Sequence, residues 1–331
     1  MSNRKTYTYL SQSDITLQIE SLVQAIADID TPAFRITQSR SGYERVEENR
    51  LSRYFTHIKQ MVDLFDDDRV EYSYSEQLQA FKEACQDIGL ERRPDGPVCL
   101  NERGTVYLDH HHSMNVLTAR IRQLTRQQRY RRRPGDRSGL AKLQETEIKA
   151  YTDAVMSIYS RTMIIRLDFY YRAEAQTRLR VEHVFDDLDA LIAKHSRHST
   201  FEHLIGYIYS VEQGDRNDGR GYHIHAAYFF NGNVVCRDIW KAIEIGELWV
   251  DITRGQGYAH SCNHDKGQYG DKCGIGHIQR SDQAIRSHTH RVMKYLVKDG
   301  QHLRMKPEGA RCLRKGTLCR FRRKTAANTD R

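Results

Sequence analysis

Apolar residues recur at helical spacing through most of the first half of the chain. In the first such stretch they include Ile15, Ile19, Leu22 and Ile26. Residues 89–105 instead hold two prolines and three glycines, a composition that predicts turns or a short hairpin. The predicted helices cover residues 14–29, 46–65 and 75–88, and a fourth runs from Asp109 to about Gln128.

The pattern changes to strands after residue 160, following one more predicted helix at 140–159. Residues 163–170 alternate, which places Arg166 and Asp168 on one face. Two later apolar runs are separated by a turn of Gly, Asp and Asn, and are expected to pair as an antiparallel hairpin. These two runs, at 204–212 and 221–230, are the second and third predicted strands. Helices are predicted at 181–195, 238–249 and 281–298, and a Gly-rich loop at 255–276.

These elements predict an α+β protein with a central antiparallel sheet and flanking helices, preceded by a mostly helical N-terminal region. The strongest break is Pro134-Gly135-Asp136-Arg137-Ser138-Gly139, directly after an Arg-rich helix end. The expected organisation is therefore a helical region at 1–139 that ends in an Arg-rich linker, a domain at 140–318, and a basic tail at 319–331.

Composition limits the function classes. Only 39% of the 331 residues are hydrophobic and no apolar run is long enough for a membrane span, so no membrane partner is expected. Seven cysteines without a secretory signal favour reduced thiols and a cytoplasmic location. The net charge is +9, and arginine, which matches phosphate oxygens, dominates the basic residues. Nucleic acid is favoured over a generically basic surface.

The third strand carries the strongest chemical signal. His223 and His225 lie two residues apart in an otherwise apolar strand, so both point to the same face. Two imidazoles on a rigid strand form half of a site for a divalent metal, although histidines satisfied within a core are an equal alternative. Mg²⁺ or Mn²⁺ would require an anionic oxygen as well. Glu212, across the hairpin, is the first candidate for a third ligand, and Asp168 is a weaker one.

A candidate nucleophile lies on the last predicted helix. His288, Arg291, Tyr295 and Lys298 follow one edge of its apolar stripe, so cations flank the tyrosine on both sides. Nearby cations favour a phenolate and hold phosphate oxygens. The alternative is a packed tyrosine on a solvated basic helix. A second Tyr-x-x-Lys, at Tyr269, falls in the Gly-rich loop.

A zinc site is a further hypothesis for this loop. Its candidate ligands have irregular spacing for known zinc modules, so unconnected side chains are favoured over a site. Whether Cys262 and Cys273 bind zinc stays open at this point. The candidate ligands are Cys262, His264, Cys273 and His277.

Taken together, a His-hydrophobic-His strand, an upstream acid and a downstream Tyr-x-x-Lys resemble the HUH single-strand endonucleases. The match is closer to the inovirus gene-II-type replication proteins and the group with the YagK/YfjJ C-terminal domain, over about residues 155–318. The segments that carry it are Ile245-Gly246-Glu247-Leu248-Trp249, Gly274-Ile275-Gly276, Tyr295-Leu296-Val297-Lys298 and Leu303-Arg304-Met305-Lys306-Pro307-Glu308-Gly309.

The resemblance implies a five-stranded antiparallel sheet and a rolling-circle replication initiator of a phage or prophage. Tyr295 would nick one DNA strand and form a 5′-phosphotyrosyl bond, while Lys298 would orient the phosphate. Metal binding would fall to His223, His225 and Glu212. The implied partners are a single-stranded or supercoiled DNA origin and a host helicase and polymerase. DNA contacts are expected from Arg291, Arg304, Lys306 and Arg311.

Alternative functions remain open. Many such initiators have two tyrosines on this helix, but positions 291 and 299 are Arg and Asp, which predicts a one-tyrosine enzyme. A relaxase or transposase would use the same site on a different DNA. A non-catalytic DNA-binding regulator would explain the charge without using Tyr295 or the histidine pair.

Overall fold

The computed structural model describes residues 9–40, 42–66, 69–214, 221–297 and 302–318. The chain forms two compact units, and neither is a continuous stretch of sequence. Unit 1 contains Met1–Asp136 together with Arg304–Gly309, and unit 2 contains Arg137–Leu303 together with Ala310–Arg331. Across the described residues, no helix combines the length and apolarity that a membrane crossing requires.

Unit 1 is mostly helical, as the sequence predicts, and its helices begin at the expected polar caps. Ser11 and Asp14 form a capping box, Ser75 accepts a hydrogen bond from the Leu78 amide, and Asp109 accepts one from the His112 amide. The elements are α1 (Gln12–Asp28), β1 (Phe34–Gln38), β2 (Glu44–Glu48), η1 (Ser52–Phe55), α2 (Ile58–Asp63), β3 (Tyr72–Tyr74), α3 (Glu76–Asp87), α4 (His110–Thr125) and β9 (Met305–Pro307).

The helix predicted over 46–65 is wrong. Residues 44–48 form strand β2, which pairs with β1, and only η1 and the short α2 follow. Asn49 marks the change, because its side-chain oxygen accepts a hydrogen bond of 2.7 Å from the Leu51 amide and so forms a turn. Leu51 and Ile58 stand seven residues apart, which is a helical spacing, but Leu51 lies in the turn and Ile58 begins α2.

Strand β9 comes from the C-terminal part of the sequence and completes unit 1. It pairs antiparallel with β3, so that Met305 lies opposite Tyr74 and is fully buried. Arg304, which is 5% exposed, forms an ion pair of 3.1 Å with Glu20 of α1. The backbone oxygen of Arg304 also accepts a hydrogen bond of 2.7 Å from the Ser75 amide.

The predicted linker at 134–139 does not interrupt the helix. Helix α5 runs from Gln128 to Met156 and therefore through the boundary between the two units at Asp136/Arg137. Pro134, Gly135 and Gly139 are poor helix formers, but the surrounding Arg, Lys, Gln, Glu and Ala residues are strong ones. Over the 29 residues of α5, the helix propensity of these strong helix formers outweighs the unfavourable propensity of the proline and the two glycines.

Unit 2 is built on a six-stranded antiparallel sheet of order β10-β5-β6-β4-β7, with β8 also paired to β4. The fold class is thus α+β as predicted, with one strand more than the five that the resemblance implies. The strands are β4 (Arg161–Tyr171), β5 (Leu204–Gln213), β6 (Tyr222–Asn231), β7 (Gly257–Ser261), β8 (Gly276–Gln279) and β10 (Leu313–Lys315). The other elements are α6 (Ala173–Gln176), α7 (Val181–Lys194), η2 (Ser199–Phe201), α8 (Asp238–Ile252), η3 (Lys266–Lys272), α9 (Gln283–Lys294) and η4 (Tyr295–Val297).

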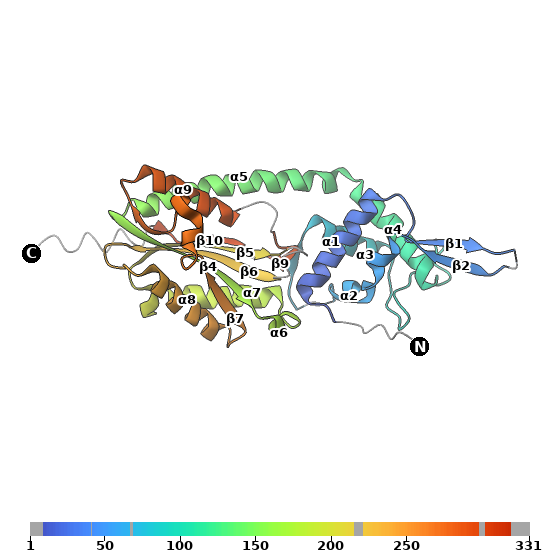
Figure 1. Cartoon of the computed structure of the whole chain (residues 1–331). Coiled ribbons are helices and arrows are strands. Elements are labelled where there is room, and N and C mark those ends of the chain that lie inside the picture. The colour runs from blue at the N-terminus through green and yellow to red at the C-terminus, as the bar shows by residue number, and fades with distance from the viewer. Residues whose placement is uncertain (1–8, 41, 67–68, 215–220, 298–301, 319–331) are drawn as a thin grey trace, which may run out of the picture. The chain divides into compact units, whose positions relative to one another are not determined.

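Helices cover both faces of this sheet (Figure 1). On one face α7 and α8 pack, with Trp249 of α8 against Phe169 of β4. On the other face the C-terminal half of α5, α9 and η4 contribute Val155, Met293 and Leu296 to a shared core. His223, His225, Glu212 and Asp168 have the side-chain parity of that second face.

His195, the half-buried residue at the C-terminal end of α7, lies in a cluster of aromatic rings. The Nε2 atom of His195 lies 2.8 Å from the hydroxyl of Tyr209, which itself donates to Tyr228. His195 Nε2 must therefore be the donor, and its buried Nδ1 has no hydrogen-bond partner. Burial lowers the pKa of His195 to about 4, because a second proton would have no acceptor.

We expect His195 to make unit 2 sensitive to acid. A histidine with a folded-state pKa below its ordinary 6.5 contributes stability above that value, and this is lost as pH falls from 6.5 through about 4. We expect the free energy of unfolding, measured with denaturant, to fall less for His195→Phe than for wild type between pH 6.5 and pH 4. The difference should be on the order of 2 kcal/mol. The control His277→Gln, at an exposed position on β8, should behave like wild type. Equal acid sensitivity in all three proteins would contradict the assignment.

Candidate metal centre and nucleophile

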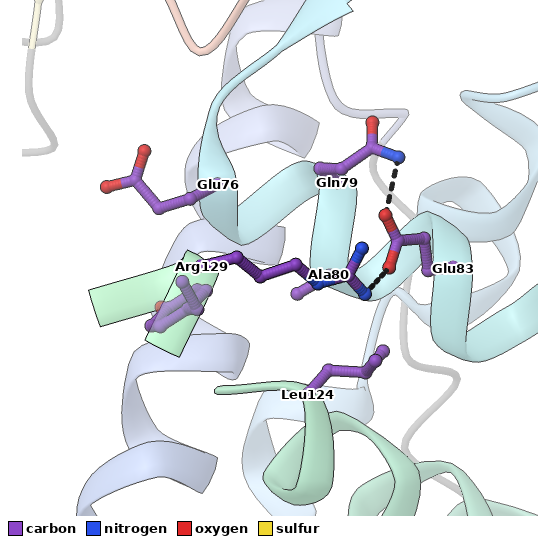
Figure 2. A pocket seen from close by; sticks show the side chains of 7 residues that line it. Glu76, Gln79, Ala80, Glu83, Leu124 and Arg129 are labelled. Atoms are coloured by element: carbon purple, nitrogen blue, oxygen red, sulfur yellow. Dashed lines mark hydrogen bonds and ion pairs between the residues drawn. The ribbon is translucent and has the colours of Figure 1, made fainter. Parts of the chain in front are cut away.

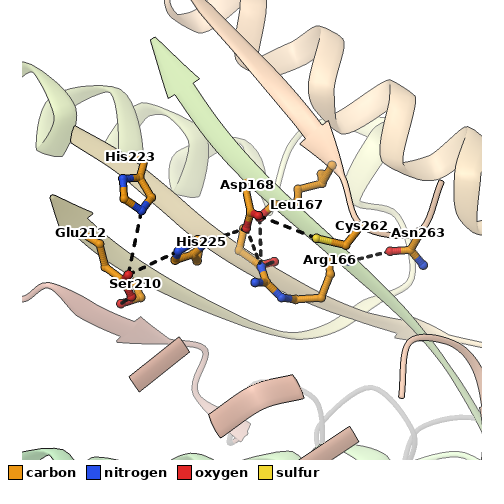
Figure 3. Close-up of polar contacts among 10 residues, drawn as sticks. Arg166, Leu167, Asp168, Ser210, Glu212, His223, His225, Cys262 and Asn263 are labelled. Atoms are coloured by element: carbon orange, nitrogen blue, oxygen red, sulfur yellow. Dashed lines mark hydrogen bonds and ion pairs between the residues drawn. The ribbon is translucent and has the colours of Figure 1, made fainter. Parts of the chain in front are cut away.

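Two neighbouring strands bring together the three side chains that the sequence predicts as metal ligands (Figure 3). The register places Glu212 of β5 opposite His223 of β6, with His225 two residues further along the same face. The Glu212 Oε2 atom lies 3.3 Å from Nε2 of His225 and 3.9 Å from Nε2 of His223. All three are buried, and their ligand atoms lie within 4.8 Å of one another. This group could hold a metal ion.

Asp168 orients one of the two histidines. It lies opposite His225 on β4, and its Oδ1 atom accepts a hydrogen bond of 2.5 Å from Nδ1 of His225. The lone pair of the ring therefore lies on Nε2, on the side of Glu212, where this buried atom makes no hydrogen bond. A histidine that binds a metal through one ring nitrogen typically donates a hydrogen bond from the other ring nitrogen to a carboxylate. His225 has this arrangement, with Nε2 left available for a metal. Asp168 is therefore placed to orient the ring of His225, and it is not placed as a third metal ligand.

A buried arginine holds Asp168 in its charged form. Arg166 is 3% exposed, and its Nη1 atom donates to Asp168 (3.1 Å) and to the backbone oxygens of Leu167 (3.1 Å) and Ala226 (2.7 Å). Burial alone would raise the pKa of Asp168, but the charge of Arg166 and the hydrogen bond from His225 hold it well below its ordinary value. The backbone amide of Arg166 donates in turn to buried Asn263 (2.8 Å).

The pKa values of the two histidines are shifted in opposite directions. Burial and the neighbouring His225 lower the pKa of His223. Burial would also lower the pKa of His225, but its hydrogen bond to Asp168 and the negative charges of Asp168 and Glu212 outweigh burial and raise that pKa. The same two carboxylates would favour a metal cation at the position of the proton. Ser210 fixes Glu212 through a hydrogen bond of 2.9 Å to Oε1, which leaves Oε2 directed at the histidines.

Tyr295 lies next to the metal-binding group. Its ring packs edge-to-face against His225, with a centroid distance of 5.5 Å, and is 44% exposed. The predicted helix 281–298 ends earlier than expected, at Lys294, and begins at the cap Asp282 instead of Ser281. Tyr295 therefore begins the 3-10 turn η4, which Leu296 anchors in the core.

The remaining predicted site residues lie elsewhere or outside the described part. Lys298 falls outside the described residues, so its predicted role stays untested. Arg291 is exposed on α9, and Arg311 is exposed in unit 2. Arg304 is buried against Glu20, and Lys306 lies on β9, both in unit 1. DNA contact by these four residues remains a prediction.

The candidate zinc ligands do not form one group in the described residues, in line with the favoured interpretation of unconnected side chains. Within the described residues, no group of potential metal ligands contains both Cys262 and Cys273. The Cys273 thiol is directed at the backbone oxygen of Ile275, at 3.6 Å. Cys262 instead belongs to a second group with Asp168 and the exposed His260. The positive charge of Arg166, hydrogen-bonded to Asp168, disfavours a cation there.

Unit 1 has a small pocket of a different character (Figure 2). Glu76, Gln79 and Glu83 of α3 and Arg129 of α5 line it. The Arg129 guanidinium lies 2.5 Å from a carboxylate oxygen of Glu83, and Gln79 donates to the other oxygen at 2.9 Å. With its cation neutralised and a second carboxylate nearby, the pocket offers no attraction for phosphate.

Comparison with models of protein families, with curated proteins and with solved structures finds no match for this chain. The function must therefore be argued from the geometry of unit 2. The sequence identifies His223, His225, Glu212 and Tyr295, and the structure brings all four together. Arg166 has no assigned role at the level of sequence, although its alternation with Asp168 on one strand is a signal for a buried ion pair.

We expect Mn²⁺ to bind at Glu212, His223 and His225. Isothermal titration should show that His225→Ala abolishes binding, because it removes the oriented Nε2 ligand. Asp168→Asn should weaken binding by roughly 10–100-fold, because it removes the carboxylate that orients the ring. The matched control is His260→Ala, which belongs to the alternative group and should bind as wild type does. Loss of binding in His260→Ala but not in Glu212→Gln would place the ion in that group instead.

We also expect Arg166 to be required for stability. Arg166→Met leaves the Asp168 carboxylate buried without its cation, which typically costs about 3–5 kcal/mol in the free energy of unfolding. Arg161→Met, at an exposed position on the same strand, should change it by less than about 0.5 kcal/mol. Adding Asp168→Asn to Arg166→Met should recover part of the loss. Urea unfolding measures all three, and a neutral Arg166→Met would contradict the role of the ion pair.

Proposed function

We propose that this protein nicks single-stranded DNA through a tyrosine nucleophile beside a metal centre, as a rolling-circle replication initiator does. The observation that carries the proposal is the packing of half-exposed Tyr295 against His225, a member of the buried metal-binding group. A nucleophile and a phosphate-polarising centre on adjacent elements are the two parts that metal-assisted phosphodiester cleavage requires.

In this proposal Tyr295 Oη attacks the scissile phosphorus. A bond forms between Oη and phosphorus, the bond from phosphorus to the 3′ oxygen breaks, and that oxygen leaves as a 3′-OH after taking a proton. The phenol proton is lost to solvent, because the ring is 44% exposed. The products are a 5′-phosphotyrosyl bond and a 3′ end that a polymerase can extend.

Three side chains would hold the metal, namely His223, His225 and Glu212. Mg²⁺ or Mn²⁺ bound there would neutralise charge on the phosphate as the bond breaks. The protein's own contribution is rigidity: the ligands lie on paired strands of a covered sheet, and Asp168 and Ser210 fix two of them by hydrogen bonds. The net charge of +9 would attract the DNA backbone.

A non-catalytic DNA-binding protein is the competing function. It would share the basic charge but would have no use for a buried Nε2 atom without a hydrogen bond beside a carboxylate. Such an arrangement costs stability unless a proton or cation is bound between the groups. A relaxase or a transposase would use the same chemistry, and the DNA substrate distinguishes these from an initiator.

The decisive experiment detects the covalent intermediate. Wild-type protein, labelled single-stranded DNA from its own genetic element and Mn²⁺ should give a protein–DNA band on a denaturing gel. Tyr295→Phe should abolish the band, because it removes the attacking oxygen, and so should a chelator or His225→Ala. Tyr269→Phe is the matched control, since Tyr269 is also half-exposed, lies beside Cys262 and is followed by Lys272 in the same spacing.

The outcomes separate the alternatives. A band that persists in Tyr295→Phe but vanishes in Tyr269→Phe would move the nucleophile to the loop. No band on any sequence from the element, with DNA binding unchanged in all variants, would reject the nickase and favour the non-catalytic function.

A further inference from the structure

A column of stacked rings leads away from the metal-binding group along the sheet. The ring of His223 stacks on Tyr170 of β4, with a centroid distance of 5.6 Å and an interplanar angle of 30°. Tyr170 stacks in turn on Tyr258 of β7, at 5.3 Å and 27°. The register explains the second contact, because Tyr170 and Tyr258 are directly opposite each other on paired strands.

The column ends at a ring that is open to solvent. His223 and Tyr170 are 3% and 5% exposed, whereas Tyr258 is 41% exposed. It lies on β7, the last strand in the order of the sheet. Tyr258 thus offers an aromatic face to solvent, and the stacked rings beneath it hold that face in place.

An arginine lies beside the chain that leads into β7. Arg172 directly follows β4, and its backbone amide donates to the backbone oxygen of Gln256 at 2.8 Å. Its side chain is exposed, and its Nε atom donates to the backbone oxygen of Gly255, just before β7, at 3.1 Å. Proteins bind single-stranded nucleic acid with exposed aromatic rings, on which bases stack, and with cations that contact the phosphates.

We propose that Tyr258 is a nucleobase-binding residue, on which a base of the DNA strand flanking the scissile phosphate stacks. The inference rests on the proposed function for the identity of the strand as DNA. It adds to that function a second anchor for the strand. Tyr295 and Tyr258 are both linked to the metal-binding group by ring contacts, the first through His225 and the second through Tyr170 and His223.

Stacking on Tyr258 has a distinct signature in binding. Every base has a π-face, so the contact is tolerant of sequence, but it disappears when the base is removed. A contact to phosphate alone would persist on an abasic strand. An interaction with a partner protein would show no dependence on the bases at all.

The test is fluorescence anisotropy of the full chain with two probes of equal length and charge, an oligothymidylate and its abasic counterpart, in the presence of a chelator. Wild type should prefer the oligothymidylate, and Tyr258→Ala should reduce this preference about tenfold. Tyr258→Phe should retain it, because the ring remains. Tyr258→Leu keeps an apolar side chain over Tyr170 and should still reduce it, which separates stacking from loss of folding.

Trp240→Ala is the matched control, because Trp240 is a 63% exposed aromatic residue on α8, which packs on the opposite face of the sheet. It should leave the preference unchanged. A base preference that is identical in wild type, Tyr258→Ala and Tyr258→Leu would overturn the proposal. The two proposals can fail independently. The covalent band of the nickase test requires metal and Tyr295, whereas the anisotropy test of Tyr258 requires neither.

Discussion

The hydrogen-bonded chain from Arg166 through Asp168 to His225 is the constraint on which the site depends. An aspartate in the middle of a covered strand would ordinarily be neutral or absent. Here a fully buried guanidinium keeps it ionised, and the ionised carboxylate fixes the tautomer and orientation of His225. The backbone oxygens that Arg166 also contacts tie this charge network to the strands themselves.

The same network explains why the two histidines are unequal. His225 has an ionic partner on one nitrogen and a carboxylate 3.3 Å from the other. His223 has a backbone oxygen 3.3 Å from Nδ1, and the same carboxylate lies farther away, 3.9 Å from Nε2. We infer that His225 is the better ordered of the two. It is also the one that Tyr295 contacts, so the residue proposed as nucleophile packs against the better held of the two histidines.

Local patterns were sufficient to predict some elements and insufficient for others. Strands β4, β5 and β6 are long and apolar, and helices with Ser or Asp caps such as α3 begin where their sequences indicate. Strands β7 and β10 could not be predicted, because Gly257–Ser261 and Leu313–Lys315 are short, partly polar and become strands only through pairing with a neighbour. Alternation along a hairpin was enough to predict that Glu212, His223 and His225 lie together. The contacts of Arg166 and Ser210 and the proposed role of Tyr258 depend on neighbours across the sheet, which no local pattern reveals.

The course of the chain has a consequence for dissecting the protein. Soon after Tyr295 the polypeptide enters unit 1, supplies β9, and then returns to unit 2 to supply β10. A fragment that stops at Asp136 would lack the partner strand of β3 and the arginine that pairs with Glu20. A fragment that begins at Arg137 would carry β9 without the strand against which Met305 is buried. The two units are interleaved in sequence, so a truncation or domain exchange made only at the Asp136/Arg137 boundary would separate unit 1 from its strand β9.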